Sequence, residues 1–529
     1  MTSESRISQS DRIPIFQKLG FAAGSNFEGF STGLALSVLW MPFFNIGLGI
    51  SPVVLSAIFM ALLAWNAVID PVMGNITDNA RTRWGRRRPF MFVAAITTAL
   101  VFPLLWHLPQ SVRNGNSWLA GVADYIPFLA KLGLASPEKA MSLYLFLIGM
   151  IFYASVCAWC MPYNALQLEL TPDYDERTRL TAWMTFFNKL GSLMNSWVLF
   201  VVMLAGMLAL GDPKALEGKP EFLQKILTDI QPALASLAGS QPGEKPVVIG
   251  VKLVCWLLAV IIVCVGLFPA LFARERYYKS EGVRRQARDP FWKNIAESSR
   301  CVPLWALIAI TFFVLLSTNS TGTLGQYVNF YYVCDGDLAK GALITGVKGS
   351  VLVVTGIACI PLFTWLGEKF DKRTMLMAML GCTMGGHLLN YFLMTPAHPW
   401  LQIISGVFEF SAVSAVWLFI PSMKADVADW DELHTARRRE GSINAFFSFF
   451  FKCALTVAMG LGGVVLQLSG FDAKLAGQPG DVTLRMFHLY LILSPALCAA
   501  GIAIAWFYPL DRTRSAQIRA TLEARRGAL

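Results

Sequence analysis

The chain has 529 residues, of which 55% are hydrophobic and 15% are charged, and its formal net charge is +10. Soluble domains carry roughly 25% charged residues, and a soluble protein of this length needs several such domains. The composition therefore argues against a soluble multidomain enzyme, a disordered chain and a secreted disulfide scaffold, and it favours a membrane protein.

Long apolar blocks follow one another along the chain. A membrane-spanning helix needs about 20 residues, because each residue rises ~1.5 Å through a hydrocarbon core roughly 30 Å thick. The expected fold class is therefore an all-α membrane protein with twelve transmembrane helices. The predicted spans are 17–47, 52–77, 89–107, 140–168, 179–211, 249–273, 302–333, 341–366, 374–395, 399–424, 441–470 and 484–508.

The basic residues predict the orientation. Most of the 44 Lys and Arg lie in alternate connections and in the two tails, all on one side if the helices alternate in direction. By the positive-inside rule this side is cytoplasmic, so both termini are expected inside an inner (plasma) membrane. The positive charge is then a topology signal, and we expect no nucleic-acid partner. The cysteines suggest neither a disulfide framework nor a metal site, and we expect no cofactor.

Short motifs recur in the second half of the chain. Gly74 and Asp78 follow the second predicted helix, and Gly367 and Asp371 follow the eighth. The sequence Asp-Tyr-Asp-Glu at 173–176 follows the fourth helix, and Asp-Trp-Asp-Glu at 429–432 follows the tenth. These repeats predict two related six-helix halves, 1–273 and 302–529, joined by a cytoplasmic linker at 274–301. Two related halves with a site between them are a transporter architecture.

The same motifs carry a family resemblance. The run from Asp70-Pro71 through Gly74 and Asp78 to Arg86-Arg87-Arg88-Pro89 resembles the helix 2–3 signature of the major facilitator superfamily. More narrowly, the chain resembles the glycoside–pentoside–hexuronide:cation symporters, which include melibiose permease. The match continues at 162–166, 173–178, 425–432 and 439–442. The resemblance implies a secondary active transporter, not an enzyme, that moves a sugar or glycoside by alternating access. We expect it to act as a monomer.

The loop motifs are candidates for a cytoplasmic gate. Arg and Asp side chains can hold two bundles together in one state and release them in another, and Gly74 is expected to let helices approach closely. The alternative is that the arginines only fix the topology and contact anionic lipid headgroups. The candidate gate residues are Gly74, Asp78, Arg86, Arg87, Arg88, Asp371, Arg373, Asp429 and Glu432.

Asp70 is the first candidate for ion coupling. It lies late in the second predicted helix, with Asn66 four residues earlier on the same face. Melibiose permease builds a cation site here from two carboxylates and an amide, whereas this chain matches only one carboxylate. The resemblance therefore favours H+ over Na+, with an uncoupled carrier or a simple ion pair as alternatives. Lys452 matches the family's helix 11 lysine and is the expected partner of Asp70.

Substrate binding is expected to use aromatic faces and neutral polar groups. Asn26 and Thr185 stand where melibiose permease grips its galactoside with charged residues, and Asn164 replaces a stacking tryptophan. The charged sugar clamp is thus absent, which leaves another glycoside, a monosaccharide or an amphiphilic lipid as the substrate. Cys160 replaces a further acid, and Tyr163 and Trp417 are the aromatic candidates.

Other ionisable residues inside the predicted spans have no motif support. Glu28, Lys189, Lys348 and Glu409 line a pore, form local ion pairs or extend their charged ends to the membrane surface. His387 is interpreted as a buried histidine with satisfied hydrogen bonds. In the long connection at 212–248, Glu221 to Leu237 forms either an amphipathic helix or a solvated linker.

Overall fold

The computed structural model contains helices and no strands in the part of the chain that it describes. The described residues are 13–80, 82–114, 136–170, 174–217, 220–239, 243–273, 299–435, 440–475 and 477–526. Most of the predicted linker at 274–301 lies outside these ranges. Asp78 and Trp417 lie within described helices, but the structure does not describe their side chains.

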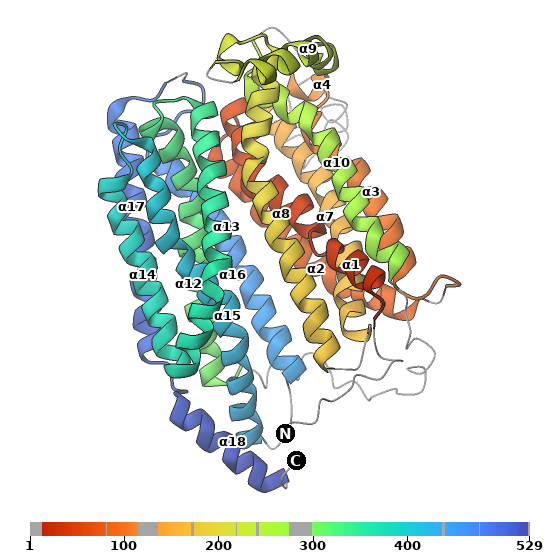
Figure 1. Cartoon of the computed structure of the whole chain (residues 1–529), viewed down its shortest axis with the longest axis vertical. Helices are drawn as coiled ribbons and strands as arrows, with labels where there is room; N and C mark the ends of the chain where they lie inside the picture. Colours follow the sequence, from red (N-terminus) through yellow and green to blue (C-terminus); the bar gives the residue numbers. More distant parts are fainter. Residues whose placement is uncertain are drawn as a thin grey trace. The chain divides into compact units, whose positions relative to one another are not determined.

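The chain divides into two compact units, 1–285 and 286–529, and the division falls within the predicted linker. Unit 1 contains α1 (Ile15–Gly24), η1 (Gly29–Leu39), η2 (Met41–Gly47), α2 (Pro52–Asn79), α3 (Arg88–Trp106), α4 (Gln110–Arg113), α7 (Pro137–Glu169), α8 (Tyr174–Ala209), η3 (Pro213–Ala215), α9 (Glu221–Ala238) and α10 (Pro246–Phe272) (Figure 1). Unit 2 contains α12 (Val302–Tyr327), η5 (Val328–Val333), α13 (Leu338–Lys369), α14 (Lys372–Leu393), η6 (Pro399–Leu401), α15 (Gln402–Thr435), α16 (Glu440–Leu468), α17 (Gly480–Trp506) and α18 (Arg512–Arg526).

The predicted spans are confirmed as long helices. Among the described residues, 11 helical segments are long and apolar enough to cross a membrane. The remaining predicted span, 399–424, lies in α15. One prediction needs correction: the first span is not a single helix over 17–47. It consists of α1, a turn at Ser25–Asn26 and the wider π-helical segments η1 and η2.

The internal repeat is visible in the packing of the helices. In unit 1, α1 contacts α8 and α10, α3 contacts α7 and α10, and α2 contacts α7. In unit 2, α12 contacts α16 and α17, α14 contacts α15 and α17, and α13 contacts α15. Each contact in the first set has its counterpart, in the same chain order, in the second. The repeated motifs thus belong to two copies of one helical arrangement.

The two copies also turn in the same way after their first span. The amide of Ile50 donates to the carbonyl six residues earlier, over 3.0 Å, and the amide of Gly336 does the same over 2.8 Å. The bond is one residue wider than its counterpart at the end of an α-helix, because both segments are π-helical, and in both kinds of ending the residue before the donor has a positive φ. Gly49 fills that position in unit 1 with φ +75°, and Asp335 fills it in unit 2 with φ +52°.

Two further helices lie outside the spans. Of the two alternatives for Glu221 to Leu237, the structure shows the helix, α9, which packs against α8 and α10 while Phe222 remains 74% exposed. The tail of unit 2 forms α18, which packs against α15 and buries Ile518 and Leu522.

An ion-pair cluster precedes α10. The Glu244 carboxylate lies 2.5 Å from the Arg113 guanidinium and 2.8 Å from the Lys252 ammonium. Burial alone would raise the pKa of Glu244, but the hydrogen bonds and charges of Lys252 and Arg113 outweigh it and lower the pKa below its ordinary value. The folded state is therefore stabilised by the ionised form of this carboxyl.

Candidate functional site

A polar stripe runs along α8. Thr181, Thr185, Asn188 and Ser192 are all exposed, and their spacing of four, three and four residues places them on one face of the helix. The hydroxyl of Thr185 donates to the Thr181 carbonyl over 2.9 Å, and that of Ser192 to the Asn188 carbonyl over 2.8 Å. Amide groups within a membrane span are costly against lipid, so this face is suited to a water-filled path.

A second polar stripe runs along α16, which is the fifth spanning helix of unit 2 as α8 is of unit 1. Asn444, Ser448, Lys452 and Thr456 follow at intervals of four residues, with the first two exposed and the others half-buried. The ammonium of Lys424 donates to Asn444 Oδ1 over 2.7 Å. Lys452 is thus the charged member of a polar face and not an isolated lysine in an apolar helix.

Asp70 and Asn66 lie one turn apart on α2, and both side chains are half-buried. Each makes polar interactions in the structure. The expected pairing of Asp70 with Lys452 joins residues of different units and stays a prediction.

Three predicted substrate residues are buried within unit 1. The Asn26 amide donates to the Phe187 carbonyl over 2.8 Å, and a Cβ on Gly191 would lie 2.1 Å from Asn26 Oδ1. Tyr163 donates to the Phe21 carbonyl over 2.9 Å and stacks on the Phe21 ring at 4.4 Å. Cys160 is also buried. These side chains pack helices together in this structure.

The other predicted substrate residues differ in accessibility. Asn164 on α7 and Thr185 on α8 are exposed, so their polar groups can reach a ligand. Among the predicted substrate residues whose side chains the structure describes, these two are the accessible ones.

Unit 2 contains a buried polar network centred on Glu409. The Lys348 ammonium on α13 lies 3.0 Å from Glu409 Oε2 on α15. Asn390 on α14 and Tyr490 on α17 donate to Glu409 Oε1 over 2.7 Å and 3.2 Å. His387 Nδ1 lies 3.8 Å from the same oxygen. For Lys348 and Glu409, the structure thus shows the local ion pair, one of the alternatives that the sequence left open.

The sequence did not identify Asn390 or Tyr490 as functional candidates. A signal was present in α14, because His387 and Asn390 are three residues apart and therefore share a helix face. Both are buried in a span that is otherwise largely apolar. A polar pair at helical spacing within such a span indicates a partner charge nearby.

Two of the predicted gate arginines bind within their own units. Arg88 donates from Nε to the Ala270 carbonyl over 2.8 Å and from its terminal nitrogen to Leu271, at the end of α10. Arg373 donates to the carbonyls of Trp506 and Tyr508, at the end of α17. In each unit, an arginine at the start of the third span thus caps the final span, where a cation also complements the helix dipole.

The other gate candidates have different environments. A Cβ on Gly74 would meet no described atom within 4 Å, and the expected close helix approach at Gly74 stays a prediction. The corresponding Gly367 does lie close to a neighbour, since its Cβ would be 3.0 Å from the Phe419 ring. The remaining candidates lie near the ends of spans: Arg86, Asp371, Asp429 and Glu432 are half-buried, and Arg87 is buried.

The repeated six-span units and the polar stripes define a membrane-embedded secondary transporter of the major facilitator type. The family model for MFS/sugar transport proteins matches residues 22–512. The chain belongs to this family.

Relatives along nearly the whole chain include several symporters. An uncharacterized symporter of Synechocystis sp. is 25% identical over 98% of each chain. The putative glycoside/cation symporter YagG of Escherichia coli is 24% identical over 98% of this chain and 96% of its own. A sodium-dependent lysophosphatidylcholine symporter of Danio rerio is 22% identical over 95% of this chain and 87% of its own.

The fold also matches solved transporters. The nucleoside transporter NupG aligns with a TM-score of 0.55 over 93% of this chain and 99% of its own, at 11% identity. At that identity the similarity shows the shared fold alone.

Proposed function

We propose that this chain is a proton-coupled symporter that carries a sugar or glycoside across the plasma membrane by alternating access. Both termini are placed in the cytoplasm by the positive-inside rule. Within its family, the proposal assigns the chain to the glycoside–pentoside–hexuronide:cation symporters.

The polar stripe of α8 is the observation that carries the proposal. Its exposed hydroxyl and amide groups are neutral, and such groups hydrogen-bond the hydroxyls of a sugar without binding an ion. Asn164 on α7 adds an exposed amide that can both donate and accept. The similarity to a putative glycoside/cation symporter agrees with this substrate class.

Coupling to protons is assigned to Asp70. Its half-buried carboxyl lies within a spanning helix, and carboxyl groups at such positions are typical carriers of protons in transporters. Asn66, one turn away, offers one further oxygen, whereas Na+ binds best among several oxygen ligands. Sodium is the alternative ion, since sodium-dependent relatives exist.

The test is uptake by proteoliposomes of a panel of labelled sugars and glycosides, with a pH gradient or a Na+ gradient imposed. We expect uptake driven by the pH gradient, lost in Asp70→Asn and kept in the control Asp229→Asn, which neutralises an exposed carboxylate of α9. Uptake driven by Na+ alone, or unchanged in Asp70→Asn, would contradict the coupling assignment.

A lipid is the second candidate substrate. It is favoured by the relatives named as lysophosphatidylcholine symporters. Failure of every sugar in the panel together with uptake of labelled lysophosphatidylcholine would replace the sugar by an amphiphile on the same fold.

A further inference from the structure

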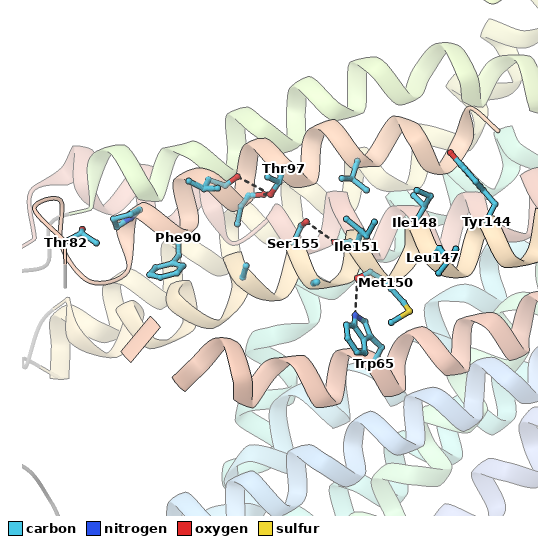
Figure 2. A pocket seen from close by; sticks show the side chains of 16 residues that line it. Trp65, Thr82, Phe90, Thr97, Tyr144, Leu147, Ile148, Met150, Ile151 and Ser155 are labelled. Carbon is cyan, nitrogen blue, oxygen red and sulfur yellow. Dashed lines mark hydrogen bonds between the residues drawn. The ribbon is translucent and has the colours of Figure 1, made fainter. Parts of the chain in front are cut away.

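An open groove lies on the surface of unit 1, along α3 and α7 and beside Trp65 of α2 (Figure 2). Its volume is about 1060 Å³. Small residues form its floor, because Ala94 of α3 and Ala154 and Ala158 of α7 leave room between larger neighbours. The groove is open to the side, where Ile151 is 53% exposed.

The groove presents hydrocarbon to its contents. Its polar lining side chains all direct a donor to a backbone carbonyl: Trp65 to Met150, Thr97 to Val93, Tyr144 to Leu104, Ser155 to Ile151 and Thr82 to Gly85. Several of these bonds are drawn in Figure 2. The remaining lining residues are apolar, and a lining of this kind suits an apolar chain better than a sugar.

The length of the groove fits a lipid tail. Its lining on α7 runs from Tyr144 to Ala158, which at 1.5 Å per residue is about 21 Å of helix. The hydrocarbon core of a bilayer is roughly 30 Å thick, so one leaflet contributes about half of that. The groove is therefore long enough to hold the acyl chain of a lipid through the full depth of its leaflet.

One end of the groove is basic. Thr82 and Pro89 line this end, and the turn between them carries Arg83, which is exposed, and Trp84, which is 63% exposed. Thr82 binds both Gly85 and Trp84 in this turn, so the turn is ordered by its own hydrogen bonds. At the membrane surface an exposed arginine attracts the phosphate of an anionic lipid, and an exposed tryptophan keeps its polar end at the interface.

We propose that this groove is a binding site for an anionic phospholipid, with an acyl chain along α3 and α7 and the phosphate at Arg83. The lipid is a resident ligand and not the transported substrate. The proposal is independent of the proposed sugar transport, because it uses none of the polar stripe residues.

The test is native mass spectrometry of the protein taken from vesicles of equal parts phosphatidylcholine and phosphatidylglycerol. We expect wild type to retain phosphatidylglycerol preferentially. Ala158→Phe and Ala154→Phe fill the groove, and each should lower retention of both lipids about tenfold. Arg83→Gln should remove the preference for phosphatidylglycerol and keep acyl-chain binding. The matched control Ala499→Phe, at an exposed alanine of α17, should retain lipid as wild type does.

Retention by both groove-filling variants at the wild-type level would overturn the groove as the site. Equal retention of the two lipids by wild type would overturn the role of Arg83. Melting temperatures of all variants, measured in the same detergent, identify a variant that has lost its fold, and the second filling variant then decides the result. Sugar uptake unchanged in a filled variant that has lost its lipid would show that the two functions are separate.

Discussion

Replacing Glu409 by leucine tests the buried network of unit 2. The substitution removes the carboxylate that Lys348, Asn390 and Tyr490 all approach. It leaves the Lys348 ammonium without its counter-charge inside a membrane span. Breaking a buried pair in this way costs more than the pair itself contributes, because the remaining charge stays buried.

The expected loss follows from the burial of the pair. Removal of one partner of a buried ion pair costs about 3–5 kcal/mol. The side chains of Lys348 and Glu409 are 20% and 17% exposed, so the pair is only partly removed from water. We therefore expect a loss at the lower end of this range, about 3 kcal/mol. At about 2–4 °C per kcal/mol, the melting temperature should fall by roughly 6–12 °C.

Intrinsic fluorescence of the detergent-solubilised protein during heating measures this change. The double variant Lys348→Met with Glu409→Leu should recover most of the loss, since apolar side chains of similar size replace a buried pair at little cost. The matched control is Arg485→Met, which breaks an exposed pair with Asp481 and should cost less than about 1 kcal/mol. A Glu409→Leu variant no less stable than this control would refute the reasoning, as would a double variant no more stable than the single one.

Three further predictions concern stability. Gly386→Ala should lower the free energy of unfolding by about 1–3 kcal/mol, because its Cβ would lie 2.6 Å from that of Phe408. Gly385→Ala, whose Cβ would meet no described atom within 4 Å, should raise it by up to about 1 kcal/mol. Equal melting temperatures of the two variants would contradict the packing. Glu244→Gln should lower the melting temperature at pH 7. The difference from wild type should shrink as the pH falls below 4.5, because the folded pKa of Glu244 is lowered and its carboxyl stabilises the fold only while it is ionised. A difference that does not depend on pH would contradict the ion-pair cluster. Arg373→Gln should speed hydrogen exchange of the amides in the last turn of α17, at a cost of about 1 kcal/mol, and unchanged exchange would exclude the cap.

The spans and the repeat could be predicted from the sequence because both depend on local patterns. Apolar blocks of about 20 residues reveal a spanning helix without knowledge of its neighbours. The paired motifs around Asp78 and Asp371 predicted two related halves, and the equivalent helix contacts in the two units agree with that interpretation. The positions of Arg88 and Arg373 at the start of helices were also visible in the sequence.

The partners of individual side chains could not be predicted in this way. Spacing says nothing about which groups meet across helices, so Lys348 and Glu409, far apart in sequence, remained two separate candidates until the structure brought them together. Asn26 was expected near substrate. In the structure its amide packs against Gly191, where any larger residue would leave no room for it. The arginine caps depend similarly on carbonyls at the far end of each unit.

Substrate-evoked proton movement tests the central claim most directly. Vesicles containing the purified protein and a pH-sensitive dye, without an imposed gradient, receive a sugar that the uptake panel has identified. Proton-coupled symport predicts acidification of the interior on sugar addition in wild type, and none in Asp70→Asn. Sugar entry without acidification, or the same acidification in both proteins, would contradict proton coupling through Asp70.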